Sequence, residues 1–415
     1  MSGASSGRTR SNLAQATRPA RPARLDAARA FGLLAFINLL VGGMVGLERT
    51  VVPVLGTDVF LLPQGAALAA FVITFGISKA VFNLFAGVLA DRIGRKRVLL
   101  VGWAIGLPVP LLIMGAPSWA WIIVANVLLG VNQAMTWSMT LNMMVDLVPV
   151  RRRGFAAGVN EFAGYLGVSL LAFLTGLLAA AYGLRPEPFY LGIAVSVLGL
   201  LASAFVPETA PAGRAPALRW VRGVGAPSLL GAATNLKDGL VWLALPLVMT
   251  ARGFDLVEIG LVAGLYPFVW ASGQVVFGPL SDRVGRKRLV LGGVALQGVG
   301  LVLVGVPLPL AALLAGAVIL GLGTSMAYPT LIAMVADRAP APERATALGI
   351  YRFFRDSGYA LGAIVAATFA AILTNTIVAT GVAMLLAAAV MTRTLQEPVA
   401  STPPGAGAAE PTSGT

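Results

Sequence analysis

Long apolar stretches alternate with short polar ones over almost the whole chain. Each is about 17–25 residues long, which is enough for an α-helix to cross the hydrocarbon layer of a membrane. A helix is required because a backbone in lipid must satisfy its polar groups within its own segment. The pattern predicts an all-α integral membrane protein with twelve spans, at 30–53, 65–89, 98–115, 119–146, 154–182, 188–206, 226–250, 256–280, 289–306, 309–336, 345–371 and 374–392.

Composition supports this prediction and narrows the chemistry. Of the 415 residues, 57% are hydrophobic and 11% are charged, far fewer charges than a soluble globule carries. The chain has no cysteine and no histidine, which excludes disulfides and thiolate or imidazole metal sites, so we expect no metal and no cofactor. No nucleophile-base constellation indicates an enzyme. Any proton carrier must be a carboxylate or a lysine.

One basic stretch occurs twice. GVLADRIGRKRVL at 87–99 is followed 191 residues later by GPLSDRVGRKRLV at 278–290, and the same offset matches Gly130 with Gly321 and Asp146 with Asp337. The chain is therefore an internal duplication with six spans in each copy. Because six is even, the two copies share one orientation, as parallel repeats about an axis along the membrane normal.

The basic residues lie mainly on one side of the predicted spans. Of the 30 Lys and Arg, 23 fall in the two tails and in the loops of one face, five fall inside predicted spans, and Arg185 and Arg252 fall on the other face. By the positive-inside rule, both termini and both copies of the motif are cytoplasmic. This distribution makes the net charge of +13 a topology signal, and we expect no nucleic-acid partner.

The domain prediction is a disordered tail (1–29), a first half (30–206), a linker (207–225), a second half (226–392) and a flexible tail (393–415).

Two six-helix halves with G-x-L-x-D-R-x-G-R-K after the second span of each resemble the major facilitator superfamily. The resemblance covers about 30–395. It implies a secondary transporter, a monomer in the inner or plasma membrane, that works by alternating access around one central cavity. It further implies that spans 1, 4, 7 and 10 line the cavity and that spans 2, 5, 8 and 11 join the halves.

The motif residues have distinct expected roles. Gly87 and Gly278 are expected to permit tight helix packing, and Gly94 and Gly285 to permit the positive φ of a short turn. The resemblance implies that Asp91, with Arg92 or Arg95 and with Asp146, locks a cytoplasmic gate, and that the second copy has a counterpart. The predicted gate residues are Gly87, Asp91, Arg92, Gly94, Arg95, Lys96, Asp146, Gly278, Asp282, Arg283, Gly285, Arg286 and Lys287.

Nine charges fall inside predicted spans. A charge at mid-bilayer costs at least ~2.5–3.5 kcal/mol, so we expect most of them to be paired or to face a cavity. Adjacent residues point about 100° apart on a helix, so Glu48 and Arg49 are expected to pair across helices. Arg352 and Asp356, four residues apart, can pair within one helix.

These charges and their polar neighbours are the candidate site. Glu48 and Asp238, at nearly equivalent places in spans 1 and 7, are the first candidates for proton coupling, followed by Glu161. The candidate cavity residues are Arg49, Lys79, Gln133, Trp137, Asn142, Asn235, Lys237, Tyr266, Trp270, Tyr328, Arg352, Arg355 and Asp356. Static salt bridges and interhelical hydrogen bonds are the competing interpretation for each residue.

The leading functional hypothesis is proton-coupled efflux of a small organic solute or toxic compound, with the membrane lipid as the other partner. The proton-coupled drug exporters of the family carry an Arg four residues before a Gly in span 4. Here the Gly is Gly130 and the earlier position is Asn126, so the chain departs from the pattern of that subgroup. Lys79, Lys237 and the span 11 arginines motivate an alternative, a carrier or exchanger of organic anions or phosphorylated metabolites. A non-transporting membrane sensor is a remote third possibility.

Overall fold

A computed structural model describes residues 24–63, 65–149, 152–209, 223–338 and 344–397. Every regular element within these ranges is helical. The helices are Arg24–Asp58 (α1), Ala66–Ile93 (α2), Arg95–Gly106 (α3), Pro108–Met114 (α4), Trp119–Asp146 (α5), Arg153–Tyr182 (α6), Glu187–Ala204 (α7), Gly225–Ala251 (α8), Leu256–Val284 (α9), Arg286–Gly305 (α10), Leu310–Arg338 (α11), Arg344–Thr368 (α12) and Leu373–Thr394 (α13), with a short 3₁₀ turn at Ala370–Ile372.

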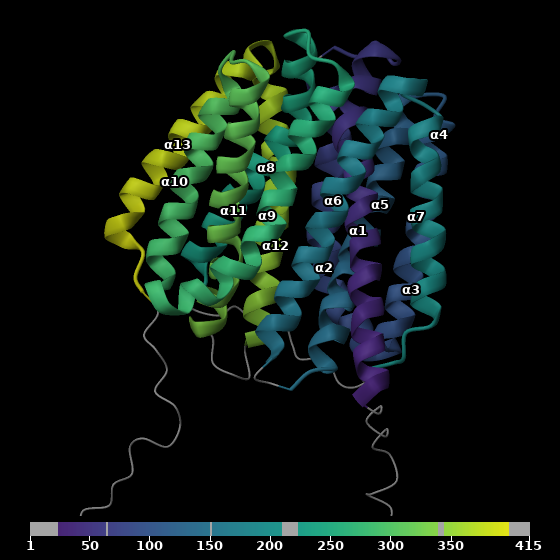
Figure 1. Ribbon diagram of the computed structural model, residues 1–415, viewed down its shortest axis with the longest axis vertical. Coiled ribbons are helices and arrows are strands. Elements are labelled where there is room, and N and C mark those ends of the chain that lie inside the picture. The colour runs from purple at the N-terminus through teal and green to yellow at the C-terminus, as the bar shows by residue number, and fades with distance from the viewer. Residues whose placement is uncertain (1–23, 64, 150–151, 210–222, 339–343, 398–415) are drawn as a thin grey trace, which may run out of the picture.

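The helices form two halves that lie side by side. In Figure 1, α1–α7 lie mostly on the right and α8–α13 mostly on the left, and the described ends of α1 and α13 lie at the bottom. The turns between α2 and α3 and between α9 and α10, which carry the repeated motif, lie at this same end. We call it the motif end. The predicted architecture of two parallel six-helix repeats is confirmed.

The third predicted span, 98–115, consists of two helices. Helix α3 ends at Gly106 and α4 begins at Pro108. Proline has no backbone N–H to donate and its ring crowds the preceding turn, so Pro108 interrupts the hydrogen-bond ladder. The apolar segment as a whole, Arg95–Met114, is still long enough to cross a membrane.

Ten helical segments of the described chain are long and apolar enough to span a membrane, and α8 and α12 are not among them. Both helices carry charges in their middle: Lys237 and Asp238 in α8, and Arg355 and Asp356 in α12, each less than a tenth exposed. The protein interior, rather than lipid, surrounds these charges. Because they lie between other helices, α8 and α12 can afford a polar composition that a lipid-facing helix cannot.

Packing between the halves follows the expected pairs. Helix α2 packs along α12, α6 packs along α9, and α1 approaches α8. Small residues allow the close approach of α6 and α9: a Cβ placed on Gly176 would lie 3.0 Å from the Cα of Gly260. Backbone contact of this kind is how membrane helices associate without a hydrophobic driving force.

The edges of the two halves are more ordered than the sequence indicates. Helix α1 begins at Arg24, inside the predicted N-terminal tail, and residues 1–23 of that tail lie outside the described residues. Residues 395–397 after α13 are described, and the rest of the C-terminal tail, 398–415, is not. Most of the predicted linker, 210–222, also lies outside the described chain.

Candidate functional site

The repeated motif forms the same turn in both halves. Gly94 joins α2 to α3 with a φ of 95°, and Gly285 joins α9 to α10 with a φ of 100°. Both values lie in the left-handed region that residues with a Cβ avoid, so the expected need for glycine at these two positions is confirmed.

Each motif copy contributes an arginine to an ion pair with the end of a later helix. Arg95 pairs with Asp146 at the end of α5, and Arg286 Nε lies 3.1 Å from Asp337 Oδ2 near the end of α11. The two pairs are related by the same 191-residue offset, so the duplication extends to contacts. Arg95 also donates to the backbone oxygen of Asn142 (3.0 Å), which places this predicted cavity residue at the motif end.

Other predicted gate residues fall into different environments. Arg92 and Arg283 are exposed, while Lys96 Nζ donates to the backbone oxygen of Ala204 at 2.7 Å. The side chains of Asp91 and Asp282 lie outside the described part of the structure, so their predicted role in the gate stays a prediction.

The expectation that Gly87 and Gly278 permit tight packing is wrong. A Cβ placed on either glycine would meet no atom within 4 Å. The tight backbone contacts occur elsewhere, for example where a Cβ on Gly167 would lie 1.9 Å from Leu39 O.

A pair of glutamates that the sequence analysis missed completes the motif end. Glu208 follows α7 and accepts from the backbone N–H groups of Arg95 and Lys96, both at 3.1 Å. Glu397 follows α13 and accepts likewise from Arg286 (2.5 Å) and Lys287 (2.8 Å). Each carboxylate therefore caps the positive N-terminus of the third span of its own half.

An ion pair joins the two halves nearer the end opposite the motif. Arg49 of α1 binds Asp238 of α8 through two hydrogen bonds, Nη2 to Oδ2 at 2.8 Å and Nη1 to Oδ1 at 3.1 Å. The Arg49 guanidinium carbon lies 5.2 Å from the centre of the Trp242 ring. Both charged side chains are at most 4% exposed, so their pairing across helices is as expected for Arg49.

Glu48 differs from its neighbour. Its side chain is 1% exposed, and neither carboxylate oxygen has a hydrogen-bond partner among the described residues. Asn126 of α5 is its polar neighbour. The expected cross-helix partner of Glu48 is therefore missing from the described chain, and a charge held there costs several kcal/mol by the general rule for unpaired buried ions.

An internal cavity of about 10 Å³ lies between the halves, large enough for roughly one water molecule. It draws residues from α2, α5 and α6 of the first half and from α11 and α12 of the second. Its lining consists of Lys79, Asn83, Gln133, Trp137, Ser138, Glu161, Tyr165, Tyr328, Arg352 and Arg355. We call it the inner cavity. Seven of these residues are among the cavity and proton-coupling candidates that the sequence predicts.

Charges around the inner cavity are unequally paired. Arg355 binds its neighbour Asp356 through Nε (2.7 Å) and Nη2 (3.0 Å). The expected pair of Arg352 with Asp356 is wrong. The Arg355 side chain is long enough to fold back onto its neighbour in the sequence, and it binds both carboxylate oxygens of Asp356. Asn235 and Asn83 also donate to Asp356. Within the described chain, Lys79 and Arg352 form no ion pair.

The remaining candidates form an aromatic and lysine cluster next to the cavity. Lys237 of α8 donates to the Tyr266 hydroxyl and, at 3.0 Å, to the Thr324 hydroxyl, and its Nζ lies 5.5 Å from the Trp270 ring centre. Trp270 in turn packs against Tyr165, with ring centres 3.5 Å apart and the ring planes tilted by 30°. Lys237 is fully buried, so these oxygens and rings replace water around its charge.

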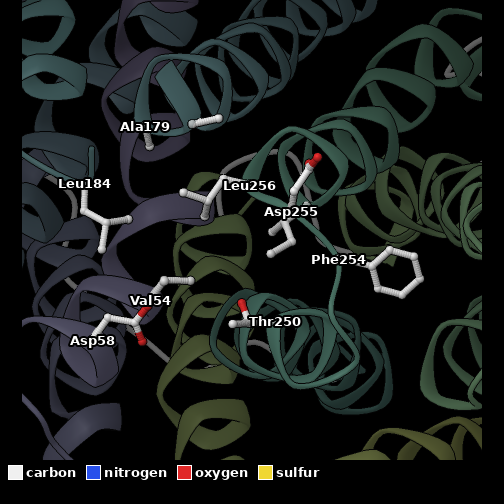
Figure 2. A pocket seen from close by; sticks show the side chains of 10 residues that line it. Val54, Asp58, Ala179, Leu184, Thr250, Phe254, Asp255 and Leu256 are labelled. Atoms are coloured by element: carbon white, nitrogen blue, oxygen red, sulfur yellow. The ribbon is translucent and has the colours of Figure 1, made fainter. Parts of the chain in front are cut away.

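A second, larger cavity of about 480 Å³ opens at the end opposite the motif. Figure 2 shows labelled side chains of both halves around it: Val54, Asp58, Ala179 and Leu184 from the first, and Thr250, Phe254, Asp255 and Leu256 from the second. We call it the outer cavity. Asp255 caps α9 by accepting from the backbone of Glu258 at 2.8 Å, and so has a structural role there.

Asn83, Ser138 and Tyr165 line the inner cavity, and the sequence analysis missed all three. Asn83 and Ser138 hydrogen bond to each other at 3.1 Å between α2 and α5. Asn83 lies one helical turn after Lys79, and this spacing is a signal that could have found it. Tyr165 stands in an apolar run of span 5, four residues after Glu161, where the same spacing applies.

The described structure is that of a polytopic membrane protein: two repeats of six span-length segments enclose the polar inner cavity at their interface. The family model of the Major Facilitator Superfamily matches residues 31–230 and 227–413, so the chain belongs to that superfamily of membrane transporters and is not an enzyme.

Similar proteins agree with this assignment. An uncharacterized MFS-type transporter of Salmonella typhimurium is 28% identical over 66% of this chain and 72% of its own length. The multidrug resistance protein MdtG of Salmonella dublin is 28% identical over 53% of this chain, and the match spans 58% of MdtG. The solved structure of the nucleoside transporter NupG has a TM-score of 0.71 at 14% identity, covering 87% of this chain and 99% of NupG, and shows a shared fold.

Proposed function

We propose that the protein is a proton-coupled secondary transporter that exports a small organic solute by alternating access. The observation that carries the proposal is the inner cavity, a polar site to which both halves contribute and which contains the carboxyl group of Glu161. The name of MdtG, a multidrug resistance protein, supports export. We place the protein as a monomer in the inner or plasma membrane, with the motif end and both termini in the cytoplasm.

Asp238 is the carboxylate best placed to couple protons to movement. It is fully buried and bound to Arg49, and the two residues belong to different halves. When the end opposite the motif opens, Arg49 and Asp238 must separate. An unpaired carboxylate in that position is costly, so uptake of a proton from the outside stabilises the open form. Closure restores the ion pair and releases the proton.

Glu48 and Glu161 have supporting roles in this proposal. Glu161 accepts a hydrogen bond from Trp137 Nε1 at 2.9 Å, while its other oxygen has no partner among the described residues. It can therefore respond to a bound solute. Glu48 forms no ion pair with any described residue, and we propose that it holds a proton in this conformation.

The test uses proteoliposomes that contain the purified protein and a trapped pH indicator. A library of small organic solutes is presented under an imposed pH gradient, and solute flux is measured by mass spectrometry. We expect flux that follows the gradient and that is lost in Asp238→Asn. Asp58→Asn, at the rim of the outer cavity, is the matched control and should keep the flux. Flux that ignores the gradient for every transported solute contradicts proton coupling.

A second candidate function is the exchange of organic anions without protons. Lys79 and Arg352 in the cavity lining favour it, since neither forms an ion pair within the described chain and Glu161 is the acid in that lining. The same proteoliposomes distinguish the two candidates. Counterflow of an anion that is unaffected by the pH gradient and by Asp238→Asn supports exchange.

A further inference from the structure

Aromatic rings from both halves form a continuous group along the inner cavity. The Tyr165 ring centre of α6 lies 5.2 Å from that of Trp137 in α5 and 3.5 Å from that of Trp270 in α9. Tyr328 of α11 meets Tyr165 nearly edge-on at 5.9 Å. Trp137, Tyr165 and Tyr328 line the cavity. Trp270 packs against Tyr165 outside that lining. We call these four residues the aromatic group.

Positive charge surrounds the aromatic group. Lys79 Nζ lies 5.4 Å from the Trp137 ring centre, and the Arg355 guanidinium carbon lies 5.1 Å from that of Tyr328. Arg352 lies in the same lining. Arg355 is neutralised by Asp356, but Lys79 and Arg352 have no acidic partner within 4 Å in the described chain. The cavity therefore presents more positive than negative charge to whatever enters it.

Two buried oxygen atoms in the lining lack hydrogen-bond partners among the described residues. Gln133 is fully buried and its Nε2 donates to Val41 O at 2.8 Å, while its Oε1 has no partner. Glu161 is 6% exposed, and its Oε2 is likewise without a partner. Buried acceptors without donors are costly, so both atoms point to a ligand that supplies a hydrogen-bond donor.

We propose that the inner cavity binds a flat aromatic anion that also carries a hydroxyl or amino donor. The aromatic ring packs against Trp137 and Tyr165, the anionic group faces Lys79 and Arg352, and the donor reaches Gln133 or Glu161. This inference rests on the proposed transport function and names its substrate class. The cavity has room for about one water in this closed form, so the ring enters as the halves part.

The three features exclude other ligand classes together rather than singly. An organic cation would stack on the rings but would meet the charges of Lys79 and Arg352. An aliphatic anion would satisfy those charges but would lose the ring contacts. An aromatic anion without a donor would leave the oxygens of Gln133 and Glu161 unpaired.

Binding of four probes to the purified full-length protein in lipid nanodiscs tests the proposal. The probes are hydroxynaphthoate, naphthoate, cyclohexanecarboxylate and naphthylmethylamine, and affinities are measured by calorimetry. We expect hydroxynaphthoate to bind tightest, followed by naphthoate, and naphthoate to bind about tenfold tighter than cyclohexanecarboxylate because it makes one or two ring contacts. Binding of naphthylmethylamine as tight as that of naphthoate overturns the proposal.

Variants separate the recognition of the ring from that of the charge. Tyr165→Leu should reduce the preference for naphthoate over cyclohexanecarboxylate severalfold, because only the Trp137 contact remains, and should leave the affinity for cyclohexanecarboxylate unchanged. General damage to the fold would not produce this result. Arg352→Gln should weaken both anions alike. Tyr182→Leu, at the exposed end of the same helix, is the control for Tyr165. A preference for naphthoate that is undiminished in Tyr165→Leu contradicts the proposal.

These binding experiments test the substrate class separately from proton coupling, so either proposal can fail without the other. If another solute follows the pH gradient in proteoliposomes while the aromatic anions show no preference, the substrate class fails and proton-coupled transport stands. If hydroxynaphthoate binds as expected but its flux ignores the gradient, proton coupling fails and the substrate class stands.

Discussion

Arg49 and Asp238 connect the two halves of the protein through two parallel hydrogen bonds, of 3.1 and 2.8 Å, between fully enclosed side chains. They are 189 residues apart and belong to helices α1 and α8. On α1, Arg49 precedes Val54 and Asp58, which line the outer cavity. We expect a movement that parts α1 from α8 at this level to separate the two residues.

Removing one partner of this pair should destabilise the protein more than removing both. Asp238→Asn leaves the Arg49 charge buried without compensation, and such losses cost about 3–5 kcal/mol. Replacing both residues with leucine removes both desolvation costs and should recover most of the stability. Thermal unfolding of the purified variants provides the measurement. Equal loss in the single and double variants would show that the pair has no coupled role.

Breaking the pair should also widen the outer cavity and expose Val54 to water. Val54 lines that cavity but is only 3% exposed, and the chain has no native cysteine to interfere with labelling. We expect Val54→Cys to react slowly with a membrane-impermeant maleimide and severalfold faster when combined with Asp238→Asn. The control is Leu61→Cys, which is 80% exposed and should react at the same rate in both backgrounds.

Reversing the ion pair at the motif end should restore what a single substitution removes. Arg95 and Asp146 are 21% and 24% exposed, so water screens them and the pair is worth at most about 1 kcal/mol, a shift of up to about fivefold between conformations. Asp146→Arg should alter the transport rate, and Arg95→Asp with Asp146→Arg should return it toward the original. Failure of the exchanged pair would indicate that these charges act separately.

Alanine should be tolerated at Gly87 and rejected at Gly42. Nothing lies within 4 Å of a Cβ on Gly87, and glycine inside a helix is less stable than alanine by about 0.5–1 kcal/mol, so Gly87→Ala should raise stability slightly. A Cβ on Gly42 would lie 1.7 Å from Gly164 O, which forces α1 and α6 apart. Expression level and unfolding temperature of the two variants are the measurements. An alanine at Gly42 that leaves both unchanged would contradict the prediction.

Much of the fold could be predicted from the sequence because membrane spans can be recognised by their length and apolarity. The spans, the duplication and the positive φ of Gly94 and Gly285 could all be predicted from local pattern. The break at Pro108 could also have been read, since a proline within a span has a known effect on the helix.

The site could be predicted only as a set of residues. Lys79 and Arg352 stood out because they are charges inside apolar spans, and sequence spacing gives the face of a single helix. It could not give the contacts between helices, and so it missed Tyr165 and paired Asp356 with the wrong arginine. Glu208 and Glu397 were missed for a related reason: their partners are backbone N–H groups, which carry no sequence signal.

The two glutamate caps have a consequence for how the chain is held together. Glu208 and Glu397 each join the last helix of a half to the third span of the same half, so each half is closed by its own residues and not by the linker. Two polypeptides produced by cutting the gene between residues 210 and 222 should therefore assemble in one membrane and regain transport, and Glu208→Ala should reduce the yield of that reassembled protein more than that of the intact chain.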